Sequence, residues 1–565
     1  MLSSLPVESE LTVPSAPASD ECSGALTNQK RLHGGARQAF RIGCAAMLLT
    51  YLFLCFFNNL VWEDFLITYR HSKNFLAGHG LVYQPGERVH GFTSPINVAA
   101  ATVSGACIPD RDPLKAIWIY RAISLVFLLG ALWQMALVFQ REEPTGVPTW
   151  ATTFFFLLFA FEFKTVSYSM SGQEPAFTVF FLALAICAVQ GGLQRCWGAA
   201  GLAWGGLMWS RPEGFIYAGG FLLGSWLWAQ HGRRSELLGA LKSVLVGAAV
   251  YLPWLIGAWI YYGNPIPHTI LAKSAMIAPG SPLSLLQHLP SLVPLTMAQV
   301  YAPIYGNSGP WPLWIKILSA LMIVPALLYW IVPSRDRLGR TASLAATGGF
   351  AYLCLISNNG GVAFPWYFPP VAFLGLFILV RFCFLLPSDL PFAVVRQPAV
   401  RRVAFAALLL VLCGMAKIFF DDAVIMKVNM QEIELGCRKP VGEWLRAHVR
   451  PGERVYLECL GYMGYYSEVK ILDYPGLAST EVLKVLREQH ANKYTAIRWL
   501  KPEWIVLRDF ETIEALHNPG LLADYEQAAR FNVLPALAQY DQFVMQSLTG
   551  DATFRVLHRR TSTAQ

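Results

Sequence analysis

The sequence predicts a polytopic α-helical membrane protein that carries a small α/β domain at its C-terminal end. Of its 565 residues, 55% are hydrophobic and only 14% are charged, whereas a soluble domain carries about a quarter charged residues. Apolar runs long enough to cross a bilayer recur as far as about residue 420. The region 421–565 lacks such runs and alternates short apolar and polar stretches, which is typical of a soluble domain.

Apolar runs in the first part of the chain predict about eleven membrane spans. The fifth is short, and it is either a full span or half of a kinked or re-entrant element. The predicted spans are 41–61, 115–140, 150–165, 174–190, 197–209, 214–231, 242–262, 311–333, 342–357, 366–386 and 403–420.

Basic residues alternate between the loops and set the predicted orientation. The N-terminal segment carries "NQKRLHGGAR", and every second loop after it carries Arg, whereas the intervening loops hold the Gly, Pro and acidic residues. Cytoplasmic loops carry an excess of Lys and Arg. The N-terminus is therefore expected inside and, with an odd number of spans, the C-terminus outside. The net charge of +8 is explained in the same way and gives no indication of nucleic-acid binding.

Three regions follow from these patterns. Residues 1–36 are rich in Ser, Pro, Ala and Gly and predict a disordered cytoplasmic tail. The first apolar run lacks a small-residue cleavage motif and leads into further spans, so we expect a retained anchor and a transmembrane domain over 37–420. In the extracytoplasmic domain 421–565, "ERVYLECL", "KILDYP" and "EWIVLRDF" predict strands, and "GEWLRAHV", 480–489 and 493–500 predict helices.

Common enzyme motifs are absent from the sequence. It contains no P-loop, no GxGxxG after a strand, no GxSxG, no HExxH and no CxxC pair. Of the 11 cysteines, Cys437 and Cys459 fall in the outer region, where a disulfide between them stays open. The unusual polar residues instead gather in the loops predicted to lie outside.

The first of these loops places Glu63 and Asp64 directly after the first span. A carboxylate at the end of a span is costly unless it meets water, a cation or a substrate. Residues 64–77 predict a short helix on the membrane, ended by Gly78. The carboxylates are either paired with Arg70 or His71, or they include a general base, for which Asp64 is the stronger candidate. The following segment, to about residue 108, is expected to dip into the outer leaflet.

Later outer loops add further charged residues. Glu174 and Glu213 each lie at the start of a span, and Arg211 lies on the side where Arg is disfavoured. Arg211 is a partner either for a phosphate or for one of these two carboxylates. The stretch "YYGNPIPHTILAKSAM" offers His268 and Lys273 at nearly helical spacing, and "FPWYFPP" suits an aromatic belt.

Five stretches in this order carry a resemblance to a known family: "EDFLITYRHSKNFLAGHGLVYQPGERVHGFTS", "SGQEPAF", "SRPEG", "YYGNPIPHTILAK" and "GYMGYYSEVKILDYPGLAS". Together they resemble the mycobacterial arabinofuranosyltransferase B family, which is a GT-C glycosyltransferase family. The resemblance runs from about residue 45 to 510 through scattered motifs. His90, Ser94 and His268 depart from the residues usual in that family.

The resemblance implies a GT-C-like fold in the bacterial plasma membrane, with an active site and a C-terminal domain on the outer face. It implies an inverting transfer of a sugar, typically D-arabinofuranose, from a polyprenyl-phosphate donor to a hydroxyl of a surface glycan or glycoprotein. The implied catalytic pair is Asp64 and Glu63. Candidate donor phosphate ligands are Arg211, Lys273, His268 and His71, and candidate supporting residues are Arg70, Glu174, Glu213, Tyr262 and Asn264.

Several alternatives remain open at this point. A divalent cation at the acidic pair is conceivable, but no ligand spacing establishes a metal site. A mannosyl- or aminoarabinosyltransferase of the same architecture is the nearest alternative enzyme. A lipid-linked sugar transporter would place its polar residues near the bilayer midplane, and a structural or export partner would use the outer domain to bind sugar. For an enzyme, we expect the aromatic residues of "GYMGYYSE" to hold the acceptor.

Overall fold

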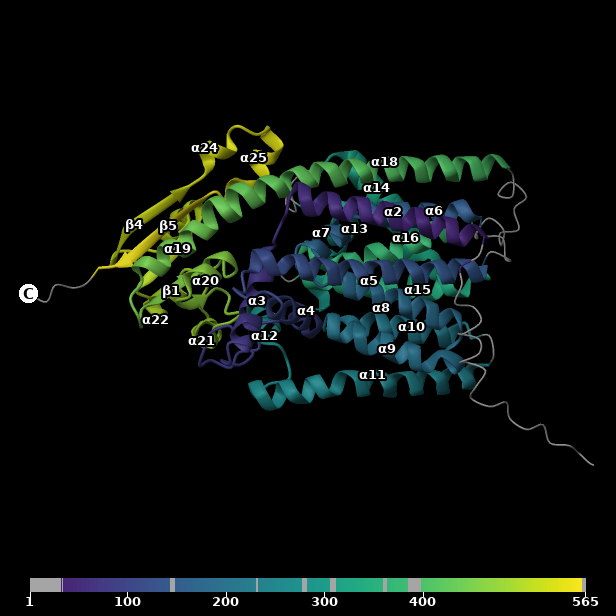
Figure 1. The fold of residues 1–565 in the computed structure, drawn as a ribbon, viewed down its shortest axis with the longest axis horizontal. Coiled ribbons are helices and arrows are strands. Elements are labelled where there is room, and N and C mark those ends of the chain that lie inside the picture. Colours follow the sequence, from purple (N-terminus) through teal and green to yellow (C-terminus); the bar gives the residue numbers. More distant parts are fainter. Residues whose placement is uncertain are drawn as a thin grey trace, which may run out of the picture.

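The computed structural model describes residues 32, 34–142, 148–229, 232–276, 282–304, 311–358, 363–384 and 398–560. The apolar helices run side by side along the long axis, and the strands gather beyond one end of them (Figure 1). A helix is present at every predicted span. These helices are α2 (Gly34–Phe57), α5 (Pro113–Glu142), α6 (Thr149–Ala160), α8 (Pro175–Gln190), α9 (Leu193–Ser210), α10 (Gly214–Leu227), α11 (Arg233–Tyr262), α14 (Leu313–Leu328), α15 (Arg337–Asn358), α16 (Pro369–Phe384) and α18 (Pro398–Val428).

Length and composition set apart two groups of apolar helices among the residues that the structure describes, and α9 and α15 belong to neither group. Five stretches are long and apolar enough to cross a membrane: Gly34–Phe57, Pro113–Glu142, Arg233–Tyr262, Leu313–Ile331 and Arg402–His448. Four apolar helices are shorter, namely Thr149–Ala160, Pro175–Gln190, Gly214–Leu227 and Pro369–Phe384. The predicted N-terminal tail lies almost entirely outside the described residues, and α2 begins at Gly34.

Shorter elements lie between these helices. The predicted surface helix is α3. α4 lies within the segment that was expected to dip into the outer leaflet. α4 has 12 residues at about 1.5 Å each and is therefore too short to cross a bilayer. A segment that only dips into the outer leaflet requires such a short helix. The remaining elements here are α3 (Glu63–Leu76), α4 (Pro95–Ala106), α7 (Phe163–Met170), α12 (His268–Met276), α13 (Pro282–Tyr301), η2 (Tyr329–Ile331) and η3 (Pro365–Tyr367).

The helix ends that the sequence assigned to one side do meet in space. The Trp62 backbone N–H donates to the Ser171 carbonyl at 2.9 Å, and the His268 N–H donates to the His90 carbonyl at 2.9 Å. In Figure 1, α3, α4 and α12 lie at the end of the bundle that faces the strands. The unusual polar loops therefore form one cluster, as the charge alternation predicted.

The C-terminal region forms a five-stranded sheet of order β2-β1-β3-β5-β4. Strands β1 and β3 pair in parallel, as do β1 and β2, whereas β5 runs antiparallel to β3 and to β4. The three predicted strands are present, and the antiparallel pair was not predicted. The strands are β1 (Arg454–Leu457), β2 (Lys470–Asp473), β3 (Trp504–Arg508), β4 (Tyr525–Asn532) and β5 (Thr553–Arg559).

Helices cover both faces of this sheet. Val455 and Val506 pack with Val441 of α19 on one face, and Tyr456 and Ile505 pack with α21 and α22 on the other. Burial on both faces explains why β1 and β3 are continuous apolar runs. The elements of this region are the π-helix η5 (Asn429–Arg438), α19 (Lys439–His448), α20 (Tyr462–Ser467), α21 (Thr480–Glu488), α22 (Ala496–Leu500), α23 (Asp509–Leu516), α24 (Leu534–Leu537), α25 (Gln542–Leu548) and η6 (Thr549–Asp551).

The structure answers two points about this region that the sequence raised. Tyr462 and Tyr465 of "GYMGYYSE" are buried rather than exposed, and the Tyr462 hydroxyl donates to the Val61 carbonyl at 3.0 Å. This stretch therefore packs the C-terminal domain against the start of α3 and does not present aromatic faces to an acceptor. Cys437 and Cys459 are both buried and free, so no disulfide joins them.

A buried ion cluster joins three membrane helices. Arg381 of α16 contacts Glu142 of α5 at 2.6 Å and Asp336, just before α15, at 2.5 Å. The Arg381 side chain is only 4% exposed. Removing one partner of a buried ion cluster leaves the remaining charges uncompensated, which costs about 3–5 kcal/mol.

We therefore expect Arg381→Met to lower the unfolding free energy by about 3–5 kcal/mol. Thermal unfolding of the detergent-solubilised protein measures this change. Arg337→Met is the control, because Arg337 is exposed and has no ion pair within the described part of the chain. Equal melting temperatures for the two variants would show that the cluster does not stabilise the bundle.

Candidate functional site

The segment that leads into α3 is fixed by a buried arginine of α5. Arg121 donates to the Asn59 side chain at 2.7 Å, to the Leu60 carbonyl at 3.0 Å and to the Met170 carbonyl at 3.0 Å. These bonds hold the turn just before Glu63 and Asp64. Sequence reasoning missed Arg121, although a lone Arg inside an apolar run is the signal that marks such a residue.

Glu63, the first residue of α3, is bound to the C-terminal domain. Its carboxylate accepts from Arg438 at 2.8 Å and from the Gly461 backbone N–H at 3.2 Å. Arg438 also contacts Glu434 at 2.7 Å and Asp551 at 3.1 Å. Both oxygens of Glu63 are therefore already in use, and the side chain anchors α3 to η5 and α20.

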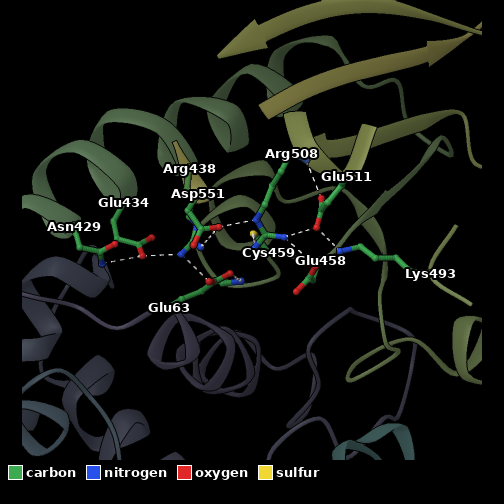
Figure 2. A network of polar contacts seen from close by, with 11 residues as sticks. Glu63, Asn429, Glu434, Arg438, Glu458, Cys459, Lys493, Arg508, Glu511 and Asp551 are labelled. Atoms are coloured by element: carbon green, nitrogen blue, oxygen red, sulfur yellow. Dashed lines mark hydrogen bonds and ion pairs between the residues drawn. The ribbon is translucent and has the colours of Figure 1, made fainter. Parts of the chain in front are cut away.

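The contacts of Glu63 continue into a larger ion network. Figure 2 shows them running from Glu63 through Arg438 and Asp551 to Arg508 and on to Lys493. Arg508, at the end of β3, contacts Asp551 at 2.6 Å and Glu511 at 2.6 Å. Lys493 contacts Glu458, which follows β1, and Glu511. The network thus ties the start of α3 to the carboxyl ends of two parallel strands.

Asp64 behaves differently from its neighbour. It is partly buried, and it makes no hydrogen bond or ion pair with the described residues. Burial raises its pKa from 3.8 to about 7; Glu63 and Glu174 also raise the pKa, whereas Lys273 and Arg438 lower it. A carboxylate that titrates near neutral pH and has no fixed partner is suited to accept a proton.

Lys273 of α12 is the cation with the largest influence on Asp64. Its ammonium donates to the Tyr367 hydroxyl at 3.3 Å and lies 5.0 Å from the centre of the Phe364 ring. It forms no ion pair within the part of the chain that the structure describes. Asp64 and Lys273 therefore bring to one site a carboxylate and an ammonium that form no ion pair with the described residues, from segments more than 200 residues apart.

Arg211 and the two glutamates form an internal cluster. Arg211 is buried and contacts both Glu174 and Glu213. Its guanidinium also lies 4.1 Å from the centre of the Tyr367 ring. Two carboxylates already balance this charge, so the structure supports the internal pairing left open above and not the direct phosphate contact.

Two predicted phosphate ligands, His71 of α3 and His268 of α12, are histidines. His71 is fully buried and its Nδ1–H donates to the Ile67 carbonyl at 2.9 Å. Burial lowers its pKa to about 4, so the imidazole is neutral and supplies no charge. Burial also lowers the pKa of His268, and its Nε2 is buried without a partner among the described residues. Both shifts favour the neutral imidazole, and the phosphate role of these histidines stays a prediction.

The remaining predicted residues hold the walls of the site. Arg70 donates to the Tyr83 carbonyl at 3.0 Å and to the Gly464 carbonyl, which joins α3 to α20. The Tyr262 hydroxyl donates to the Leu81 carbonyl at 2.7 Å, and the Asn264 side chain accepts from the Ile266 N–H at 2.9 Å. These contacts shape the loops around Asp64 and Lys273. Among the described residues, no group of three His, Cys, Asp or Glu side chains could hold a metal ion.

Sequence comparison gives a relative of named activity and a family match. A terminal β-(1→2)-arabinofuranosyltransferase of Corynebacterium glutamicum is 27% identical over 310 residues, which is 50% of this chain and 41% of that relative. The chain therefore spans less than half of that relative's length in the match. Residues 426–556 match a family described as a domain of unknown function (DUF8728).

Two solved structures share the fold. ArnT from Cupriavidus metallidurans bound to undecaprenyl phosphate aligns with a TM-score of 0.52 at 12% identity, covering 93% of this chain and 98% of ArnT. The Archaeoglobus fulgidus oligosaccharyltransferase tethered with an acceptor peptide aligns with a TM-score of 0.51 at 14% identity, covering 88% and 72% of the two chains. The chain is thus a multi-pass membrane protein with the fold of the GT-C glycosyltransferases, and half of its sequence is similar to an arabinofuranosyltransferase.

Proposed function

We propose that the chain is an inverting glycosyltransferase that takes a sugar, D-arabinofuranose in our interpretation, from a polyprenyl phosphate. The acceptor is a hydroxyl of a surface glycan or glycoprotein at the outer face of the plasma membrane. The observation that carries the proposal is the meeting of Asp64, which has no fixed partner, with Lys273. The named activity of the Corynebacterium relative and the lipid phosphate bound to ArnT agree with it.

In this mechanism Asp64 is the general base. The acceptor oxygen attacks the anomeric carbon while its proton passes to the Asp64 carboxylate. The bond from the anomeric carbon to the phosphate oxygen breaks, and the phosphate leaves with the bonding electrons. A phosphate is a good leaving group that needs charge neutralisation more than a proton, and the Lys273 ammonium supplies it. Attack from the face opposite the phosphate inverts the anomeric centre.

A panel of synthetic donors tests the proposal directly. Purified protein is incubated with polyprenyl phosphates that carry arabinofuranose, 4-amino-arabinose or mannose, together with an arabinan acceptor. We expect transfer from the arabinofuranose donor and an inverted linkage in the product. Preference for another sugar would assign the chain to a different GT-C activity. If no donor supports sugar transfer and the lipid-linked sugar moves across the membrane of vesicles that contain the protein, a transporter would be favoured.

Lys273→Ala is expected to raise the KM for the polyprenyl-phosphate donor about ten- to hundredfold, because a charged hydrogen bond to the phosphate is lost. Steady-state kinetics with varied donor concentration measures the change. Lys417→Ala is the matched control, since Lys417 is exposed and its ion pair among the described residues is with Asp421 at 2.8 Å. An unchanged donor KM in the Lys273 variant would contradict the phosphate role.

A further inference from the structure

Four partly exposed aromatic side chains form a contiguous group that reaches from the residue before the acidic pair to Lys273. We call Trp62, Phe364, Trp366 and Tyr367 the aromatic platform. Phe364 and Trp366 stack with ring centres 4.6 Å apart and planes 4° apart. Trp62, the residue next to the acidic pair, meets Trp366 at 6.2 Å, and Tyr367 lies 6.4 Å from Phe364. The platform is therefore continuous although its rings come from two distant segments.

The platform is held from behind by protein groups. Tyr168 of α7 is buried and meets Trp62 edge-on at 5.2 Å and Trp366 at 5.9 Å. Arg211, fixed by its two glutamates, covers Tyr367. The buried Arg211 cluster therefore supports the position of Tyr367 in the platform. All four platform rings nevertheless keep accessible surface, so the side chains are fixed in orientation but not covered.

Charged groups flank the platform at both ends. The Lys273 ammonium lies 5.0 Å from the centre of the Phe364 ring and 5.7 Å from that of Tyr367. Asp64 lies two residues after Trp62 in the chain, at the start of α3. In the proposed reaction the phosphate binds at Lys273 and the anomeric carbon faces Asp64. The sugar ring, which joins these two points, then lies along the aromatic faces.

We propose that the aromatic platform binds the sugar ring of the lipid-linked donor, with Phe364 and Trp366 as its centre. This inference rests on the proposed function and adds the residues that recognise the sugar. Rigid aromatic rings offer apolar faces at little conformational cost, and the carbon–hydrogen face of a sugar ring is complementary to them. An aromatic belt facing lipid, which the sequence favoured for "FPWYFPP", would not need contacts to Lys273 and to the start of α3.

The test separates contacts to sugar from contacts to phosphate. Two quantities are measured for each variant: the KM of the donor, and the affinity of sugar-free polyprenyl phosphate as a competitive product. We expect Trp366→Ala to raise the donor KM about three- to tenfold with no change in the affinity for sugar-free polyprenyl phosphate. Trp366→Phe should restore most of the KM. Lys273→Ala should weaken both ligands.

A control and two contrary outcomes complete the experiment. Trp259→Ala is the control, because Trp259 is 60% exposed on α11 and is not part of the platform. Equal weakening of donor and sugar-free polyprenyl phosphate by Trp366→Ala, or no change in either, would overturn the platform as the sugar site. Transfer by the wild-type protein would still stand in those cases. Absence of transfer by the wild-type protein from every donor would instead refute the proposed function itself.

Discussion

Asp64→Asn is expected to lower the turnover of sugar transfer by about 10²–10⁴-fold, the usual contribution of a positioned general base. The amide has nearly the shape of the carboxylate but cannot accept the proton of the acceptor hydroxyl. Donor binding should change little, because Lys273 and the aromatic platform remain. Rates at saturating donor and acceptor measure the effect. Retention of the wild-type rate would remove Asp64 from the reaction.

The pH dependence of the wild-type protein follows from the same group. With the pKa of Asp64 raised to about 7, the side chain is protonated below that pH and cannot act as a base. Turnover should therefore rise with pH up to about 7 and then level off. The residual activity of Asp64→Asn should lack this acidic limb, that is, the rise of turnover with pH. Asp421→Asn serves as the control, because Asp421 is exposed and pairs with Lys417.

The stability of Asp64→Asn should change in the opposite sense to its activity. A folded-state pKa above the ordinary 3.8 means that the folded protein binds this proton more tightly than the unfolded chain. The contribution of Asp64 to stability therefore falls as the pH rises from about 4 through about 7. At pH 8 the Asn variant should melt no lower than the wild-type protein, so loss of activity cannot be ascribed to unfolding.

Arg438→Met is expected to have the second large effect. The guanidinium is 7% exposed and contacts three carboxylates, those of Glu63, Glu434 and Asp551. Its removal leaves them without their common cation, which should cost about 3–5 kcal/mol of unfolding free energy. The variant should also have lower turnover, because Glu63 no longer holds the first turn of α3 against the C-terminal domain.

The pH profile distinguishes positioning of Asp64 from general loss of stability. Arg438 lowers the pKa of Asp64 and Glu63 raises it, so the Met variant should shift the acidic limb of the turnover profile to higher pH. Arg438→Lys should return it toward the wild-type position. Arg530→Met is the control, since Arg530 pairs with Asp509 at the surface of the sheet and should change neither quantity. A shift of melting temperature without a shift of the profile would assign Arg438 a purely structural role.

Local patterns were sufficient to predict most of the fold. Continuous apolar runs predicted the spans, and a helix lies at each of them. The runs "RVYL" and "WIVL" correctly predicted two buried parallel strands. α13 was missed because Pro290 and Pro294 interrupt its apolar pattern. β4 was missed because it is an edge strand with mostly exposed side chains, so burial imposes no hydrophobic alternation on it.

The site was only partly predictable for a different reason. Asp64 stood out because a charge at the end of an apolar run is costly without a partner. Lys273 was indicated by its spacing from His268 and by the family resemblance. Arg438 pairs with Glu63 across 375 residues, and no local pattern indicates such a partner. The same limit applies to Arg211, whose position was marked by the sequence although the choice among its candidate partners depends on the tertiary fold.

The bond between Glu63 and Arg438 has a consequence for chimeric proteins. The loop 58–92 and the C-terminal domain share contacts at Glu63, at the Tyr83 hydroxyl, which donates to the Leu460 carbonyl at 2.8 Å, and at Gln84, which bonds Ile471 in both directions. A graft that joins the membrane bundle of one relative to the soluble domain of another at residue 421 would cut through all of them. An exchangeable module must therefore contain residues 58–92 together with 429–560. Both pieces have to come from the same relative, although most of the bundle separates them along the chain.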